Sequence, residues 1–387
     1  MGLITKTTDL NAACARLAQH DFVTLDTEFM RETTFFSKLC LIQLASLEED
    51  ILIDPLAPDL DLTAFYDLLR NEKVLKVLHA GRQDIEIFWH SDQCIPNPVF
   101  DTQIAAMVCG YGDSVSYEQL VHDLAKARID KSSRFTDWSQ RPLSDSQRHY
   151  ARSDVTHLRT VYLALNEKLH ANGRTHWLAD EMKILTSPST YDLHPQDAWQ
   201  RLRGRLRKPR DLGLLMELCA WRENEARERN VPRSRVLKDD AIMDLVTSSP
   251  RSVEAMAKLR SLPSGFERSR AASDILTAIE KGLAHDPKSL PVLEKPERRN
   301  GNGATVELLK VLLKMVSEKE GVAAKVLATT DDLEAIAHDD EAPVPALQGW
   351  RLPVFGTQAL ALKHGKLALA IKDGKVLTHN LLSLIHI

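Results

Sequence analysis

The sequence that decides the fold reads Phe22-Val23-Thr24-Leu25-Asp26-Thr27-Glu28-Phe29. Its apolar residues and its β-branched threonines predict a β-strand. Because successive side chains of a strand point to opposite faces, Asp26 and Glu28 lie on one side, roughly 6–7 Å apart at their Cα atoms. Two unpaired carboxylates on a core strand are unfavourable, and a divalent cation such as Mg²⁺ or Mn²⁺ between them would remove the repulsion. The alternative is a strand end at which both acids are solvated.

Composition restricts the kind of protein. The 387 residues are enough for two or three domains, and 43% hydrophobic with 27% charged residues is typical of a soluble globular chain. No apolar run is long enough to predict a transmembrane helix, and the first residues do not resemble a signal peptide. Five cysteines without CxxC spacing indicate a reduced, cytoplasmic protein without a thiolate metal site.

The net charge of −4 hides an asymmetry along the chain. Residues 1–200 carry 19 basic and 29 acidic side chains, a net charge of −10. Residues 201–290 carry 19 basic and 13 acidic side chains, a net charge of +6. The acidic half is suited to cations, and the basic middle is suited to phosphates.

The pattern of residues 1–187 predicts one α/β domain. Further strands are expected at 38–45, 51–54 and 74–78, and helices at 62–70, 81–90, 101–109 and 117–125. Short spacings between the first strands predict antiparallel neighbours, and the later alternation predicts a mixed sheet flanked by helices.

A capping box at Ser144 and Gln147 predicts the start of a long helix that ends near His170, with Gly173 as its stop. Apolar residues at steps of four and three predict its buried face. They are Ala151, Val155, Leu158, Tyr162 and Leu165.

The rest of the chain predicts helical domains joined by linkers. The expected parts are a basic linker at 188–210, a helical domain at 211–288, a linker at 289–304 and a second helical domain at 305–372, helical to about Ile371. The two helical segments resemble each other weakly, which indicates a diverged duplication or only a shared pattern of small bundles. Residues 382–387 fit neither a helix end nor a polar tail and are interpreted as a sequence artefact.

Further polar residues accompany Asp26 and Glu28. Asp84 and Asp101 each follow a strand and start a helix, where they could also serve only to complement the helix dipole. Tyr150 and Asp154 are four residues apart on the late helix and therefore share a face. Taken singly, the tyrosine could be a core residue and the aspartate a solvated one.

The order of these residues resembles the DEDD superfamily of 3′-to-5′ exonucleases, in its tyrosine-containing subclass, and within it the ribonuclease D family. The matching motifs are Leu25-Asp26-Thr27-Glu28-Phe29, Val77-Leu78-His79-Ala80-Gly81-Arg82-Gln83-Asp84 and Tyr150-Ala151-Arg152-Ser153-Asp154. Two further stretches are similar to that family: Phe100–Ala106, and Asp137-Trp138-Ser139-Gln140-Arg141-Pro142-Leu143. Residues 211–285 resemble the HRDC domain through Trp221-Arg222, Asn230-Val231-Pro232 and Asp239-Asp240.

The resemblance implies an α/β, ribonuclease H-like mixed-sheet exonuclease domain followed by two small all-α, HRDC-like domains. It implies two divalent cations, Mg²⁺ or Mn²⁺, with Asp26 bridging both, Glu28 and Asp154 holding one and Asp84 holding the other. Tyr150 would orient the attacking water. His79 and Asp101 are interpreted as structural.

The expected function is 3′-to-5′ exoribonuclease activity that releases 5′-mononucleotides from structured RNA such as tRNA precursors, by a monomeric cytoplasmic protein that does not bind membranes. The residues expected to bind RNA are Arg201, Arg203, Arg205, Arg207, Lys208 and Arg210. A second basic surface could add Arg222, Arg227, Arg229, Arg233, Arg235 and Lys238. The alternatives are an exonuclease that acts on DNA and a non-catalytic RNA-binding scaffold.

Overall fold

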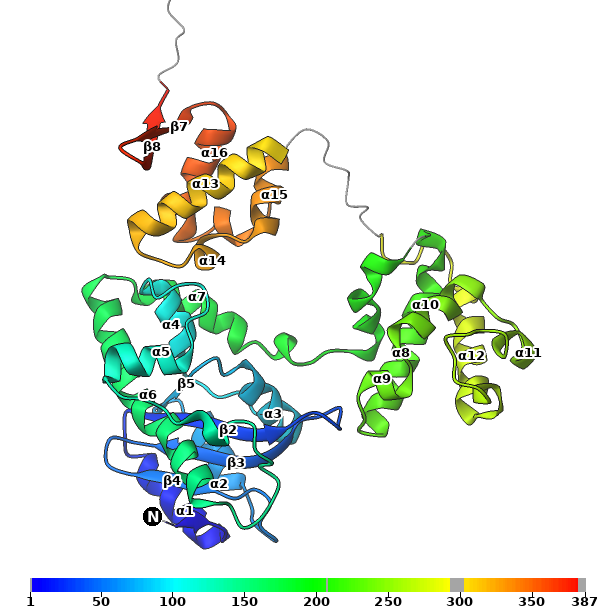
Figure 1. Ribbon diagram of the computed structural model, residues 1–387, viewed down its shortest axis with the longest axis horizontal. Coiled ribbons are helices and arrows are strands. Elements are labelled where there is room, and N and C mark those ends of the chain that lie inside the picture. The colour runs from blue at the N-terminus through cyan, green and yellow to red at the C-terminus, as the bar shows by residue number, and fades with distance from the viewer. Residues whose placement is uncertain (1, 207, 293–302, 382–387) are drawn as a thin grey trace, which may run out of the picture.

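The computed structural model describes residues 2–206, 208–292 and 303–381 of the chain. An α/β domain comes first, and two helical domains follow it (Figure 1). In the described part of the chain, no helix combines the length and the hydropathy needed to span a membrane. The predicted artefact at 382–387 lies outside the described residues.

A six-stranded mixed sheet forms the centre of the first domain, with the strand order β1-β4-β3-β2-β5-β6. β2 pairs antiparallel with β3 and, on its other side, parallel with β5. The strand that carries Asp26 and Glu28 is therefore in the interior of the sheet. The strands are β1 Leu3–Ile4, β2 Phe22–Met30, β3 Lys38–Ala45, β4 Asp50–Ile53, β5 Leu75–Leu78 and β6 Val99–Asp101.

Helices cover both faces of this sheet. α6 packs across β2, β3 and β4 on one face. On the other face α1, α2 and α3 supply Leu10, Phe65 and Phe88, which pack with Val23 and Leu25 of β2. The helices of the domain are α1 Thr7–Leu17, α2 Thr63–Arg70, α3 Arg82–Asp92, α4 Thr102–Val108, α5 Tyr117–Leu120, α6 Asp145–Ala171 and α7 Thr175–Leu185.

Most of these elements agree with the sequence predictions. The four predicted strands are present, and the predicted capping box starts α6: the Ser144 hydroxyl accepts from the Gln147 backbone N–H, and the Gln147 side chain accepts from the Ser144 N–H. The predicted apolar face of α6 is buried. The predictions omit β1, α1 and α7, and the helix expected at 117–125 is α5 followed by a π-helix, Val121–Ala125.

The first helical domain contains α8 Leu212–Glu228, α9 Arg233–Val236, α10 Asp239–Ser248, α11 Val253–Met256 and α12 Arg270–Ala284. Its core also contains Trp199 and Leu202, so the segment 188–210 is not an unpacked linker. A 3-10 helix, Pro195–Arg201, carries Trp199 and packs along α8. Basic residues dominate the composition of this segment, so the packing of its two buried apolar residues, Trp199 and Leu202, was not predicted.

The second helical domain contains α13 Gly303–Glu320, α14 Ala324–Leu327, α15 Thr330–His338 and α16 Thr357–Lys363. The prediction of helix up to Ile371 is wrong, because the chain forms an antiparallel hairpin of β7 Leu367–Lys372 and β8 Lys375–Asn380. Its turn residues Asp373 and Gly374 have positive φ angles of 52° and 74°. Asp-Gly is a strong hairpin signal because this turn requires positive φ at both positions. Of the predicted linker 289–304, residues 293–302 lie outside the described part.

The second helical domain shares one apolar core with the α/β domain. Leu309 and Phe355 belong to the same cluster of buried residues as Phe22 of β2. The indole rings of Trp177 in α7 and Trp350 are stacked, with centroids 4.0 Å apart and planes at 5°. These contacts make the α/β domain and the second helical domain one packed unit.

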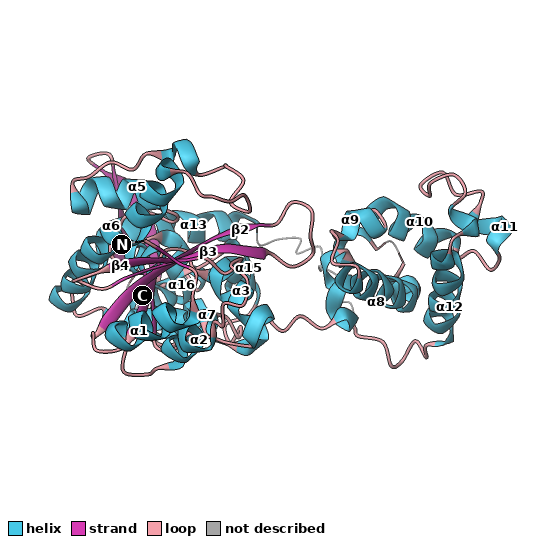
Figure 2. Cartoon of the chain, turned by 90° about the horizontal axis from the view of Figure 1, so that it is seen from below, coloured by secondary structure: helices cyan, strands magenta, loops and turns pink. Residues whose placement is uncertain are grey.

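The first helical domain contacts the α/β domain through a small interface that we call the clasp, formed by Phe35, Phe36, Arg227, Asn230 and Arg233. Asn230 Oδ1 accepts hydrogen bonds from the backbone N–H groups of Phe35 and Phe36, at 3.1 and 3.0 Å. The guanidinium carbons of Arg227 and Arg233 lie 5.4 and 4.5 Å from the centroid of the Phe35 ring. Figure 2 shows the turn between β2 and β3 reaching toward α9.

All five cysteines are buried and none forms a disulfide bond. Burial raises the thiol pKa to about 12 for Cys14 and Cys219, and to about 11 for Cys94 and Cys109. The reactive thiolate form is therefore scarce at neutral pH.

Candidate active site

Three carboxylates converge between β2 and α6. Asp26 and Glu28 come from β2, and Asp154 comes from α6. An oxygen of each carboxylate lies within 4.8 Å of the other two, and the described residues contain no other such group of potential metal ligands. Asp84, in the first turn of α3, lines the same cavity. The structure thus brings together the four predicted metal-binding side chains.

The pleat of β2 explains how its side chains are directed. Leu25 points into the core beneath α1, α2 and α3. Thr24 is on the opposite face and donates its hydroxyl hydrogen to the Val155 carbonyl oxygen of α6 at 2.8 Å. Asp26 and Glu28 follow Thr24 at steps of two, so they also face α6. The register against β3 shifts directly after Glu28, and such bulges are common beside active sites.

Asp84 is positioned by the turn that leads into α3. Ala80 in this turn has a φ of 55°, a left-handed conformation that is uncommon for residues other than glycine. The Asp101 carboxylate stabilises the turn by accepting from the backbone N–H groups of Ala80 and Gly81, at 3.1 and 2.9 Å. The Thr27 hydroxyl donates to Asp84 Oδ1. Asp101 therefore has the structural role that the sequence predicts.

Burial raises the pKa of all four carboxyl groups. It raises the pKa of Asp84 and Asp154 to about 7, and together with the charges of Asp154 and Asp84 it raises that of Glu28 to about 9. The pKa of Asp26 lies well above its usual range, because the group is buried and close to the other three carboxylates. Ionised carboxylates in this setting need a counter-charge.

The donor set fits a divalent cation bound through oxygen atoms. Carboxylates are the preferred ligands of Mg²⁺ and Mn²⁺, and a cation would balance the charge that the buried site disfavours. Gln43 supports this fit: it lies opposite Asp26 across β2 and β3, is fully buried, and its side-chain amide has no hydrogen-bond partner among the described residues. Buried amides are rarely unpaired unless water or an ion is nearby.

Tyr150 lies one turn before Asp154 on α6, and both side chains line the cavity. Burial, followed by the charges of Asp154, Glu28 and Asp26, raises the pKa of Tyr150 above its usual value. The hydroxyl therefore remains protonated at neutral pH. A second tyrosine that the sequence analysis does not single out, Tyr117, donates to the Asp154 backbone carbonyl at 2.6 Å and helps to fix this turn of the helix.

His79 also lines the cavity, and it is the hydrogen-bonded core histidine that the sequence predicts. Its Nδ1 atom lies 3.0 Å from Thr102 Oγ1. Burial lowers the pKa of His79 to about 4, so the ring is neutral at physiological pH.

The cavity has a volume of about 620 Å³, and the loop before α6 forms part of its wall. Arg134 and Phe135 of this loop line the cavity. The sequence alone gives them no role, because an irregular loop has no periodicity from which to infer where side chains point. The available signal was their position, three and two residues before the Asp137-Trp138 motif.

The residues expected to bind RNA lie on the surface of the segment before α8. The exposed members are Arg201, Arg203, Arg205, Lys208 and Arg210, while Arg207 lies outside the described residues. Arg205 forms an ion pair with Asp240, and Arg210 Nε lies 3.7 Å from the Asp211 carboxylate. Their role in RNA binding remains a prediction.

Members of the second basic surface have structural partners instead. Arg222 is 4% exposed and donates to the Leu237 carbonyl and the Asp239 carboxylate, so its assignment to a phosphate-binding surface is wrong. Arg227 and Arg233 belong to the clasp, and both also form ion pairs with the buried Glu223 carboxylate. Buried or paired arginines cannot be recognised from charge counts alone.

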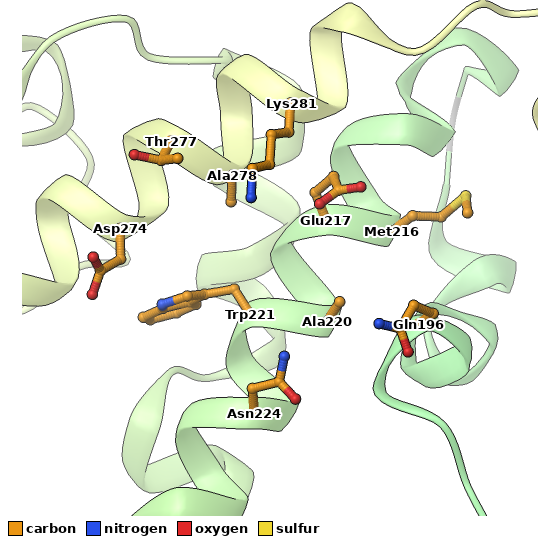
Figure 3. A pocket seen from close by; sticks show the side chains of 10 residues that line it. All are labelled: Gln196, Met216, Glu217, Ala220, Trp221, Asn224, Asp274, Thr277, Ala278 and Lys281. Atoms are coloured by element: carbon orange, nitrogen blue, oxygen red, sulfur yellow. The ribbon is translucent and has the colours of Figure 1, made fainter.

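A second cavity lies between α8 and α12 of the first helical domain (Figure 3). Its volume is about 440 Å³. Side chains that line it include Glu217, Trp221, Asn224, Asp274 and Lys281. No group of three metal ligands occurs here among the described residues, so the candidate reaction centre is in the α/β domain.

Comparisons with known protein families and structures agree with this location. Residues 1–170 match the family described as 3′-5′ exonuclease, and residues 211–279 match the HRDC domain family. The crystal structure of Escherichia coli RNase D, described as an exoribonuclease involved in structured RNA processing, matches with a TM-score of 0.81 at 28% identity. That match covers 94% of this chain and 98% of the other. The catalytic core of RRP6 from Trypanosoma brucei shares the fold at a TM-score of 0.55 and 21% identity, over 74% of this chain and 80% of that one.

Relatives of known name match over nearly the whole length. Ribonuclease D of Nitrobacter hamburgensis is 57% identical over 97% of this chain and 98% of its own. Ribonuclease D of Bartonella henselae is 46% identical over 98% of this chain and 94% of its own. The alternative of a non-catalytic scaffold is thereby excluded. The chain belongs to the ribonuclease D family of 3′-5′ exoribonucleases.

Proposed function

We propose that the chain removes nucleotides from RNA 3′ ends as 5′-mononucleotides, with two divalent cations, Mg²⁺ or Mn²⁺, at the carboxylate cluster. The observation that carries the proposal is the meeting of Asp26, Glu28 and Asp154 within 4.8 Å, in surroundings that raise their pKa values. DEDD exonucleases normally use divalent metal, and this donor set agrees with that use.

In this proposal the four carboxylates are divided between the two cations. Asp26, Glu28 and Asp154 would hold one cation, and Asp84 with Asp26 would hold the other. The family resemblance implies Asp26 as the shared ligand, and the closeness of its carboxyl group to the other three supports this role. Two cations bound here would stabilise the attacking and leaving oxygens of the phosphodiester and lower the pKa of the attacking water.

Tyr150 orients the attacking water rather than removing its proton. Its pKa is raised by burial and by the nearby carboxylates, so a tyrosinate is not available as a general base at neutral pH. The positioning role is supported by the location of Tyr150, which lines the same cavity as the four carboxylates, one helical turn from Asp154.

The proposed substrates are structured RNAs with free 3′ ends, such as tRNA precursors. The Escherichia coli relative is described as an exoribonuclease involved in structured RNA processing, and this supports the choice. The net charge of +6 in residues 201–290 would attract the phosphate backbone that the acidic α/β domain repels. An exonuclease that acts on DNA with the same site is the second candidate, and the monomeric and cytoplasmic state remain predictions.

The test is to incubate the protein with a 3′-extended tRNA and with a DNA strand of the same sequence, each in Mg²⁺, Mn²⁺ or EDTA. The expected result is stepwise shortening of the RNA, with 5′-mononucleotides identified by chromatography, and loss of activity in EDTA. Asp26→Asn should reduce the rate more than a thousandfold while circular dichroism shows an unchanged fold.

Three results would contradict parts of this proposal. Faster digestion of DNA would favour the second candidate. Nucleoside 3′-phosphates among the products would exclude water attack that leaves the phosphate on the released nucleotide's 5′ oxygen. A tenth or more of the wild-type rate in Asp26→Asn would exclude Asp26 as the shared ligand.

A further inference from the structure

Arg134 and Phe135 line the catalytic cavity and have no part in the proposed mechanism. Phe135 is 91% exposed, the largest exposed fraction among the large apolar side chains that the structure describes. Burying a phenylalanine side chain is worth about 1.5–3 kcal/mol, so leaving this ring in water is unfavourable. Because this exposed ring lies in the wall of the catalytic cavity, it is accessible to a substrate that enters the cavity.

Arg134 brings positive charge to a cavity that is otherwise dominated by carboxylates. Its charge lowers the pKa of Glu28 and Asp154, against the larger effect of burial. Lys131, on the same wall, is already paired with Glu118. Arg134 instead lies beside the aromatic ring, with its guanidinium carbon 5.2 Å from the Phe135 ring centroid.

Hydrogen bonds on both sides fix the backbone that carries this pair. On one side, Ser133 Oγ lies 2.8 Å from Ser146 Oγ at the start of α6. On the other side, Thr136 Oγ1 donates to the Ser133 carbonyl at 2.7 Å and accepts from Gln147 Nε2 at 3.0 Å. The loop is thus tied to the helix that carries Tyr150, and its two free side chains face the cavity from a held backbone.

We propose that this pair receives the 3′-terminal nucleotide of the RNA, with Phe135 stacking on its base and Arg134 pairing with its phosphate. The proposal rests on the proposed exoribonuclease function and adds the residues that hold the substrate. Arginine is suited to phosphate because its planar guanidinium donates charge-assisted hydrogen bonds. An exonuclease must accept each base in turn, and stacking on an aromatic ring tolerates every base because each has a π-face.

The test compares two single-stranded RNA decamers that differ only in whether the 3′-terminal nucleotide carries a base. On the intact RNA, Phe135→Ala should raise KM about tenfold to a hundredfold and change kcat by less than about threefold, because stacking is worth about 1–3 kcal/mol per base. On the RNA without the terminal base, wild type and Phe135→Ala should have equal KM values. Phe135→Tyr, which keeps a ring, should restore the wild-type KM.

Arg134 is tested in the same assay. Arg134→Gln should lower kcat/KM at least tenfold on both RNAs, because a phosphate is present in each, and Arg134→Lys should recover part of the loss. The matched controls are Leu47→Ala, which removes a 60% exposed apolar side chain, and Arg148→Gln, which removes an arginine paired with Asp145. Neither residue lines the cavity, and neither variant should change KM.

A binding measurement separates this inference from the proposed function. In an Asp26→Asn background, fluorescence anisotropy of the labelled decamer should show weaker binding when Phe135→Ala is added. An active wild type with no difference for Phe135→Ala would overturn the inference and leave the function intact. Equal losses on both RNAs would also overturn it, because they would mean a displaced loop. An inactive wild type would overturn the proposed function, while the anisotropy would still decide whether Phe135 contacts RNA.

Discussion

The two helical domains are attached to the exonuclease domain in opposite ways. The second domain contributes Leu309 and Phe355 to the core that contains Phe22, and Trp350 stacks on Trp177. The first domain is joined by the segment 188–210 and by the clasp, whose contacts are hydrogen bonds to Asn230 and arginines over a phenyl ring. One attachment is apolar and buried, and the other is polar and small.

This difference assigns separate tasks to two domains that resemble each other in sequence pattern. An interface that continues the core stabilises the catalytic domain, because separating it would expose apolar surface to water. A small polar interface costs little to open, so a domain held in this way can change its position when a substrate binds. The domain with the light attachment is also the one with the positive charge.

Removing the second helical domain should have the largest effect. A protein truncated after Val292 keeps the whole proposed active site and the first helical domain, but it loses its share of the common core. We expect thermal unfolding to begin at least about 10 °C lower, or an insoluble product, because several buried side chains would lose their partners. Circular dichroism melting of both proteins is the measurement, and equal melting temperatures would show that the shared core does not stabilise the exonuclease domain.

Single substitutions can compare the two interfaces directly. Trp350→Ala should reduce the free energy of unfolding by about 3–5 kcal/mol, as for other buried aromatic residues. Phe35→Ala in the clasp should reduce it by at most about 1 kcal/mol, in the range of an exposed cation–π contact. Denaturant unfolding gives both values, and a loss for Phe35→Ala as large as that for Trp350→Ala would show that the clasp is not a light attachment.

Removing basic side chains should weaken RNA binding when they belong to the first helical domain or to the segment before it, but not when they belong to the second helical domain. Replacing Arg201, Arg203 and Lys208 with Gln should weaken the binding of tRNA-sized RNA and flatten the slope of log affinity against log salt by roughly 2, at about 0.7 for each lost phosphate contact. The matched control replaces the exposed Lys366, Lys372 and Lys375 of the second domain. Identical slopes for the two triple variants would mean that the basic segment does not contact phosphate.

A smaller effect is expected from divalent cation on stability, and it should depend on pH. The carboxyl groups of Glu28, Asp84 and Asp154 have raised pKa values in the fold, so they oppose folding increasingly as pH rises from about 4 toward 9. A cation binds the ionised groups, so Mg²⁺ or Mn²⁺ should raise the melting temperature by a few degrees at pH 8 and by less at pH 5.5. Calorimetry should show this shift in the unit formed with the second domain and not in the first helical domain.

The parts of the fold that could be predicted from the sequence are those in which one local pattern determines the secondary structure. The alternation in β2 and the capping box of α6 each predict an element, and their spacing brings Asp26 and Asp154 to facing surfaces. The hairpin at β7 and β8 was missed although Asp373-Gly374 signals a turn, because the apolar residues before it continue a helical pattern. The packing of Trp199 was missed because the segment 188–210 is basic overall, and a single buried apolar residue does not change that composition.

Within the candidate site, the sequence predicts the carboxylates but not what surrounds them. Motif order identifies Asp84 without showing that Thr27 and the strained turn at Ala80 hold it in place. Phe135 and Gln43 could not be placed, because a loop and a cross-strand neighbour are decided by tertiary contacts rather than by local pattern. The clasp could not be predicted for the same reason, since Phe35 and Asn230 are far apart in the sequence and meet only through tertiary structure.

Because all five cysteines are buried, fluorescent dyes can be attached selectively on the two sides of the clasp, and the distance across it can be measured. Maleimide dyes react with thiolates, and these thiols are both inaccessible and weakly acidic, so the natural protein should label very slowly. Exposed cysteines introduced by Glu32→Cys and Ser234→Cys would then be the two sites that accept a donor and an acceptor dye, and no natural cysteine would have to be removed. Energy transfer between them would report the distance across the clasp in single molecules, before and after RNA is added.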